Sequence, residues 1–284
     1  MKKSVYKGMR AALATMHHKE QVIIPHIGTK IGIEITVPDV NTDSLGTFSG
    51  EIKRQKSMLE TAVAKAHLGM EKEGFSLGIA SEGSFGPHPA IPFIPANYEL
   101  IVFVDTIHKQ VIYESMLSQK TNFGQLILST AQAPIDFLKR VLFPSHGLMV
   151  SSVQSCQEKI IYKGITNNTE LEKAINTCFA LSENQTVLLE TDMRAHMNPT
   201  RMSSIELVAK RLAKKIVTHC PSCAIPGFGV VRIEAGLPCK VCFMPTENPY
   251  HRIVGCAKCP YTEVLAYKKN IAFADPAQCG YCNP

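Results

Sequence analysis

The sequence lacks the long apolar runs of a membrane or secreted protein. No run approaches the roughly 18 apolar residues that a membrane-spanning helix needs. The first apolar stretch, residues 11–14, is far too short for the hydrophobic region of a secretory signal. Tryptophan is absent, but apolar residues make up 45% of the chain and exclude a disordered protein. We therefore expect a soluble, cytoplasmic protein without a membrane partner.

Cysteine, in contrast, is abundant. The chain has ten cysteines, and because a reducing compartment disfavours disulfides, metal binding or catalysis is the expected reason. Cys156 and Cys178 stand alone and are expected to be buried core thiols. The other eight form four Cys-x-x-Cys pairs, which are Cys220/Cys223, Cys239/Cys242, Cys256/Cys259 and Cys279/Cys282.

These pairs predict two structural zinc sites with four thiolate ligands each. Spacers of 15, 13 and 19 residues separate the pairs, and each is long enough for a hairpin to bring two pairs around one tetrahedral ion. Strand-like runs at residues 229–233 and 263–267 are typical of zinc ribbons. Sequential, nested and interleaved pairings remain open, and the sequential one is the simplest. We expect a double zinc-ribbon module at residues 219–284 that does not fold without metal.

The positive charge of this segment is a poor guide to its partners. Of the formal net charge of +6, residues 206–284 carry +5. Eight thiolates with two zinc ions would add −4, so the metal-loaded segment is nearly neutral. Nucleic-acid binding therefore stays an alternative to an ordinary solvated surface.

Residues 1–218 predict an α/β domain with a mixed sheet flanked by helices, because strand-like and helix-like segments alternate. Strands at residues 100–105 and 111–116 are expected to form a hairpin. The other expected strands cover residues 11–15, 32–37, 77–81, 148–153, 159–162 and 187–190. The expected helices cover residues 17–26, 52–73, 135–143, 169–181 and 203–218.

Three polar clusters each follow a predicted strand, where α/β proteins collect ligands. They are residues 15–20, residues 81–89, which we expect to be a loop rich in glycine and proline, and residues 190–201. Free amides at the start of a helix can bind an anion that a lysine neutralises. Each cluster also has a purely structural interpretation, as a capped turn, a tight loop or a salt-bridged loop.

Four motifs are distinctive: GTFSGE at residues 46–51, SEGSFGPHP at 81–89, TDMRAH with NPTR at 191–201, and CGYCNP at 279–284. Together they resemble a bacterial family catalogued as a domain of unknown function. The resemblance covers nearly the whole chain and implies no known activity.

The segments around Lys19, Lys65 and Glu82 are also similar to the inosine-triphosphate pyrophosphatase superfamily. In that superfamily a Thr-x-Asn-x-x-Lys segment binds the triphosphate, and a long helix carries an Asn-Ala-x-x-Lys-Ala pattern. Acidic residues after the next strand hold magnesium and a water. Thr15 and Lys19 match the first segment, although His17 replaces the Asn and the lysine comes one residue early. Lys65 matches the helix, and Glu82 matches the acidic loop without its usual second acid.

This resemblance implies a metal-dependent hydrolase, or a binder, of nucleotide-like phosphorylated ligands. Lys19, Glu82 and His88 are then catalytic, with Glu82 holding Mg²⁺ together with Glu51 or Asp43, and His88 or a metal-bound water transferring a proton. The ligand-binding residues are Thr15, His17, Lys65, Ser81, Arg194 and Arg201. The alternative is a non-enzymatic module whose zinc ribbons bind nucleic acid or a protein. Catalysis by zinc is disfavoured, because four-cysteine sites leave no open coordination position.

Overall fold

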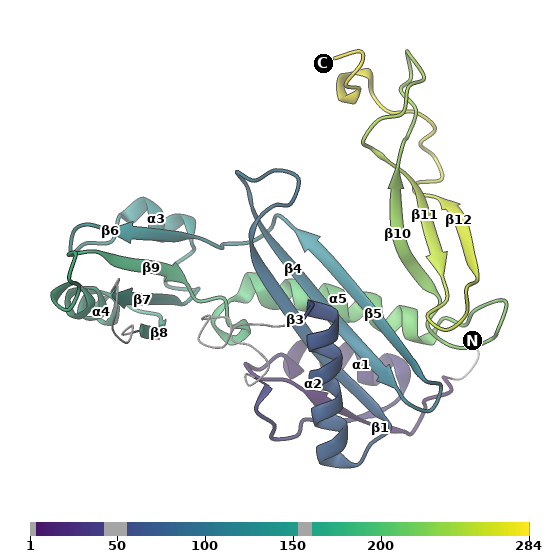
Figure 1. The fold of residues 1–284 in the computed structure, drawn as a ribbon, viewed down its shortest axis with the longest axis horizontal. Coiled ribbons are helices and arrows are strands. Elements are labelled where there is room, and N and C mark those ends of the chain that lie inside the picture. The colour runs from purple at the N-terminus through teal and green to yellow at the C-terminus, as the bar shows by residue number, and fades with distance from the viewer. Residues whose placement is uncertain (1–3, 43–55, 153–160, 284) are drawn as a thin grey trace. The chain divides into compact units, whose positions relative to one another are not determined.

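A computed structural model of the chain describes residues 4–42, 56–152 and 161–283 (Figure 1). Two compact units are present, Met1–Val104 with Tyr113–Leu212, and Asp105–Ile112 with Ala213–Pro284. The second unit therefore begins before residue 219 and takes in a hairpin tip from the middle of the chain. No helix in the described ranges is long and apolar enough to cross a membrane. Cys156, Asp43, Glu51 and the 46–51 motif lie outside the described residues.

The first unit is built on a mixed five-stranded sheet in the order β2-β1-β3-β4-β5. The buried strand β1 pairs in parallel with both β2 and β3, and Ala14 at its end lies opposite Ala80. A short turn joins β4 and β5, as predicted for the hairpin. The strands are β1 Arg10–Ala14, β2 Glu34–Thr36, β3 Leu77–Pro87, β4 Pro95–Asp105 and β5 Gln110–Ser118.

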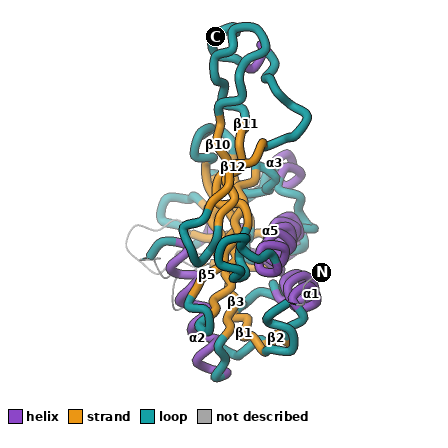
Figure 2. Tube along the Cα trace, turned by 90° about the vertical axis from the view of Figure 1, so that its right-hand side faces the viewer, coloured by secondary structure: helices purple, strands orange, loops and turns teal. Residues whose placement is uncertain are grey.

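Helices cover both faces of this sheet. Figure 2 shows α2 on one face and α1 and α5 together on the other. Helix α2 starts at a capping box between Ser57 and Glu60, and it packs so closely on β3 that a Cβ at Gly78 would lie 2.5 Å from the sulfur of Met70. The helices are α1 Glu20–Ile31, α2 Met58–Glu73 and α5 Pro199–Val217.

A second sheet in the first unit is antiparallel, in the order β6-β9-β7-β8. Side chains from its strands and from α3 and α4 form one apolar core, in which Cys178 is fully buried, as expected. The elements are β6 Gln125–Leu128, α3 Ile135–Arg140, β7 Leu148–Ser152, β8 Ile161–Ile165, α4 Asn168–Ala180, β9 Val187–Thr191 and the short helix η2 Ala195–Met197.

The second unit contains an antiparallel sheet in the order β10-β11-β12. Its register places Gly229 opposite Gly255 at one end and Ala235 opposite Pro249 at the other. The elements are β10 Gly229–Ala235, β11 Pro249–Gly255, β12 Thr262–Ala266 and the short helix η3 Pro276–Gln278.

Several predicted elements need correction. The helix expected at residues 17–26 instead covers Glu20–Ile31, and Gly32, with a φ of 76°, is its left-handed cap. The strand expected to end at Ser81 continues to Pro87, so the second polar cluster is mostly strand and not loop. Strands β6 and β11 have no counterpart among the predicted elements. We expected α2 to start at residue 52, which lies outside the described residues. Within the described residues the helix begins at Met58.

Candidate functional site

Eight cysteines of the second unit gather into two groups of four thiols. Within each group all the sulfur atoms lie within 4.8 Å of one another. Sulfur atoms of different pairs approach to between 3.6 and 3.9 Å. A tetrahedral ion with Zn–S bonds of about 2.3 Å sets its ligands about 3.8 Å apart, so each group fits such an ion. The groups are Cys220, Cys223, Cys256 and Cys259, and Cys239, Cys242, Cys279 and Cys282.

The pairs are interleaved: the first joins the third, and the second joins the fourth. Strand β10 lies between Cys223 and Cys239, and its seven residues span roughly 23 Å at about 3.3 Å per residue. These two cysteines therefore lie at opposite ends of the sheet and cannot share one ion. The sequential pairing that looked simplest is wrong.

Backbone amides point at several of these sulfur atoms. The amides of Lys258 and Cys259 approach the sulfur of Cys256 at 3.3 and 3.4 Å. The amides of Cys242 and Val241 lower the pKa of Cys239 to about 7. Such amides stabilise the thiolate, which is the form that binds a metal.

In the first unit, polar residues meet just beyond the carboxyl end of β1. Ser81 and Glu82 follow the last β3 residue that pairs with β1. Because side chains alternate along a strand, the two point to opposite faces of the sheet. Lys19 donates a hydrogen bond to Ser81 Oγ at 3.0 Å on one face, and Lys65 of α2 forms an ion pair with Glu82 on the other. The two predicted lysines therefore reach adjacent residues from opposite sides.

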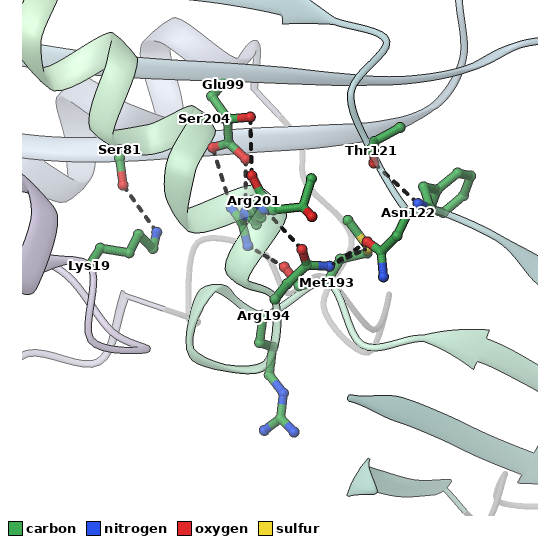
Figure 3. Close-up of polar contacts among 12 residues, drawn as sticks. Lys19, Ser81, Glu99, Thr121, Asn122, Met193, Arg194, Arg201 and Ser204 are labelled. Atoms are coloured by element: carbon green, nitrogen blue, oxygen red, sulfur yellow. Dashed lines mark hydrogen bonds and ion pairs between the residues drawn. The ribbon is translucent and has the colours of Figure 1, made fainter. Parts of the chain in front are cut away.

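Lys19 is a buried cation whose ammonium contacts no carboxylate among the described residues. It makes one hydrogen bond there, to Ser81 (Figure 3). Burial, followed by the charge of Arg201, lowers the pKa of Lys19 to about 8, so the group is still mostly protonated at neutral pH. A buried charge with so few partners is costly unless an opposite charge joins it.

Arg201, a predicted ligand-binding residue, contacts other parts of the protein. Its Nε donates to Glu99 Oε1 at 2.8 Å and its Nη1 to the carbonyl oxygen of Met193 at 2.5 Å (Figure 3). The guanidinium also lies 5.0 Å from the centre of the Phe85 ring. Gly83 makes this approach possible, because a Cβ there would lie 2.6 Å from Arg201 Nη2. Arg201 thus links β3, β4 and the start of α5.

The turn between β1 and α1 brings two histidines to the same region. His17 and His18 both have left-handed backbones, with φ of 67° and 60°, which is costly for residues other than glycine. The ring of His17 stacks on His196 at 5.0 Å. Burial, and then the charge of Lys19, lower the pKa of His17 to about 3. The turn therefore lies in a positive electrostatic field.

Arg194 and Asp192 form a close pair beside these histidines. Arg194 Nη2 lies 2.6 Å from Asp192 Oδ2, and the same oxygen accepts a hydrogen bond from the amide of Gly164 at 3.0 Å. Burial, and then Arg194, lower the pKa of His196. Arg194 therefore adds to the field around the histidines although a carboxylate partly neutralises it.

A hollow of about 520 Å³ opens between the first turns of α1 and α5. Val22, Ala195 and Met202 give it apolar walls, and His18 and His196 give it polar ones. Glu206 also lines it and pairs with Lys210 at 2.7 Å. The size of the hollow is that of typical small-ligand pockets, which hold roughly 300 to 1,000 Å³.

Some predicted partners are not brought together. His88 lies six residues beyond Glu82 along the chain, about 20 Å for an extended strand. Thr15 Oγ1 donates to the carbonyl oxygen of Met16 at 3.2 Å. The residues also do not fit the implied magnesium, because Glu82 pairs with Lys65, and in the described ranges the cysteine groups alone bring three or more potential metal ligands together.

Comparison with known proteins identifies the family of this chain. A family model described as a domain of unknown function, DUF6671, matches residues 65–284. No curated protein matches the chain. The match includes all eight clustered cysteines and the Arg201 region, whereas Lys19 and the histidine turn precede it. The match was expected over nearly the whole chain but covers residues 65–284, which leaves out the 46–51 motif. The chain therefore belongs to the DUF6671 family.

Proposed function

We propose that the first unit binds a phosphorylated small ligand, with its phosphate at Lys19 and the rest of the ligand in the adjacent hollow between α1 and α5, which is lined by His18, the neighbour of Lys19 in the chain. The observation that carries this proposal is the buried, protonated ammonium of Lys19, which contacts no carboxylate among the described residues. A phosphate would supply the missing opposite charge, and its hydrogen bonds to Lys19 would be charge-assisted and strong.

Two neighbouring features suit the same anion. Lys19 is the N-cap of α1, so the positive end of this twelve-residue helix lies next to Lys19 in the chain. His196 Nδ1 is buried and has no hydrogen-bond partner in the described part of the chain. The imidazole can donate from that nitrogen to a phosphate oxygen.

The nucleotide class of ligand rests on the resemblance to the inosine-triphosphate pyrophosphatase superfamily. Thr15 and Lys19 occupy the matching phosphate-binding segment, and the apolar walls formed by Val22, Ala195 and Met202 can accommodate a base. We propose binding and not hydrolysis, because the described carboxylates near Lys19 are each paired with a cation.

We further propose that the second unit binds two structural zinc ions. Four thiolates at tetrahedral spacing favour zinc, and closed four-cysteine sites are structural. Zinc would hold the ends of β10, β11 and β12. The side chains of β10 and β12 are largely exposed. This small sheet has too few buried apolar residues to be stable on its own.

Replacing Lys19 with Met should weaken ligand binding. Loss of a charge-assisted hydrogen bond typically costs about 1.5 to 3 kcal/mol, so the dissociation constant should rise about 10- to 100-fold. Isothermal titration calorimetry with phosphate, pyrophosphate and a panel of nucleotides measures the effect. Lys30→Met, at an exposed position in the last turn of the same helix, is the matched control and should bind as the wild type does. Equal affinity of wild type and Lys19→Met would reject the site.

Ligand affinity should also fall as the pH rises above about 8. The pKa of Lys19 is lowered to about 8 in the free protein, so free Lys19 loses its proton above that pH, whereas a bound phosphate favours the protonated form. The charges that face Lys19 are Arg201, Glu99, Lys65 and Glu82. Calorimetry between pH 6.5 and 9.5 should show a decline of up to tenfold per pH unit, and Lys19→Met should remove this dependence. A dependence that persists in the variant would assign it to another group.

A further inference from the structure

The second unit has a hollow of its own, of about 350 Å³, beside the second cysteine group. Tyr250, Tyr267 and Phe273 line it with aromatic rings. The amide of Tyr267 donates to the carbonyl oxygen of Tyr250 at 2.8 Å, which fixes these two residues side by side. Phe273 packs edge-to-face against the exposed ring of Phe243, with centroids 5.9 Å apart. Aromatic surface therefore continues from the hollow to the exterior.

Two amide side chains stand at the edge of this hollow. Asn248 Nδ2 donates to Gln278 Oε1 at 3.1 Å. Asn248 Oδ1 and Gln278 Nε2 make no hydrogen bond to the described residues, so one acceptor and one donor group remain available next to each other. Adjacent donors and acceptors are what the edge of a nucleic-acid base presents.

Lysines surround the same place. Lys268 lines the hollow and Lys269 follows it, both exposed. Lys240 lies next to the hollow, because its amide donates to the carbonyl oxygen of Ala274 at 3.0 Å. One acid, Asp275, also lines the hollow and accepts a hydrogen bond from the amide of Ala277 at 2.8 Å, so three lysines stand against one carboxylate. Positive charge is thus available to a phosphate backbone at the rim.

We propose that this hollow binds an unpaired base of single-stranded nucleic acid, stacked on its aromatic rings and read by Asn248 and Gln278, while Lys268 and Lys269 contact the flanking phosphates. Stacking on aromatic side chains and contacts to the base edges are how proteins hold unpaired nucleotides. A protein partner would use the exposed aromatic surface but would have no need of the paired amides. This site is independent of the phosphorylated-ligand site of the first unit.

The salt dependence of binding should be shallow. A four-thiolate zinc site carries a charge of −2, and the second cysteine group lies beside the hollow, so the net positive charge of this surface is small. Two phosphate contacts predict a slope of log affinity against log salt near −1.4, at about −0.7 per contact for single strands. A general electrostatic surface would give a much steeper slope.

The test uses the zinc-loaded full chain and fluorescently labelled 12-nucleotide single strands, as both RNA and DNA, read by anisotropy at two salt concentrations. Phe273→Ala and Tyr250→Ala should each weaken binding about tenfold or more. Phe93→Ala is the matched control, because Phe93 is 96% exposed in the first unit. Lys19→Met should leave this binding unchanged, which separates the two sites. Native mass spectrometry should confirm two zinc ions in every variant.

Comparison of the RNA and DNA strands identifies the sugar that the site accepts. Three results would overturn the proposal: no binding of either single strand, equal binding by Phe273→Ala and the wild type, or tighter binding of duplex than of single strand. Self-association that depends on Phe273, in the absence of any oligonucleotide binding, would show instead that the surface serves a protein contact.

Discussion

Replacing Cys239 with Ser should remove one of two zinc ions and unfold the part of the second unit that this ion holds. Structural zinc supplies about 10 to 16 kcal/mol of apparent folding free energy in small modules, more than a short three-stranded sheet can replace. Native mass spectrometry should show one zinc ion per chain in place of two. Hydrogen exchange should show lost protection in residues 236–249 and 268–283, with the other end of the sheet retained. A chain that keeps two ions would contradict this assignment.

Double variants test the interleaved pairing directly. Cys220→Ser with Cys256→Ser alters one predicted site and should cost one ion, as either single variant does. Cys220→Ser with Cys239→Ser alters both sites and should cost two ions. Sequential pairing predicts the opposite stoichiometry for the two double variants. Cys178→Ser is the matched control, because this thiol lies in the apolar core of the first unit and should leave the zinc content unchanged.

Replacing Arg201 with Met should have the second large effect, a loss of about 3 to 5 kcal/mol of stability. The substitution leaves the carboxylate of Glu99 buried without its ion pair, and it also removes the hydrogen bond to the carbonyl oxygen of Met193. Burial already raises the pKa of Glu99, which shows how unfavourable the charge is there. Urea unfolding followed by circular dichroism measures the change.

Two further variants show whether the loss comes from the unpaired charge. Adding Glu99→Gln to Arg201→Met removes that charge and should recover part of the stability. Arg10→Met is the matched control, because Arg10 pairs with Glu34 at 3.8 Å with both side chains mostly exposed. Its loss should be below about 1 kcal/mol. If the double variant loses as much free energy of unfolding as the Arg201→Met and Glu99→Gln single variants lose together, the two residues act independently.

The sequence contained enough information for the metal ligands but not for their pairing. Cys-x-x-Cys spacing identifies the eight ligands because a turn of that length brings two thiolates to one ion. The run at residues 229–233 also indicated a strand between the first two pairs, and a strand holds its ends apart. That observation argues against sequential pairing. The spacing could not show, however, that β11 pairs antiparallel with β10 and so carries the chain back to the first cysteine pair.

The charged region of the first unit was predictable only in part. Lys19, Ser81 and Arg201 belong to three polar clusters that each follow a predicted strand, and Lys19 contacts Ser81 as neighbouring strand ends allow. The strand before the third cluster, β9, belongs to the other sheet, which the sequence did not indicate. Glu99 was missed, because it directly precedes a buried apolar stretch of β4 and looks like the polar end of a strand. Gly83 suggested a loop, although its role is to leave room for the Arg201 guanidinium. Local sequence could not show that need, since Arg201 comes from a distant helix.

Interleaving also sets the order in which the metal sites can be completed during synthesis. All four ligands of the first cysteine group precede Cys279 along the chain, so synthesis supplies a complete first group before it adds the last two ligands of the second. Until then Cys239 and Cys242 have no partners, and a nascent chain would expose them as reactive thiols.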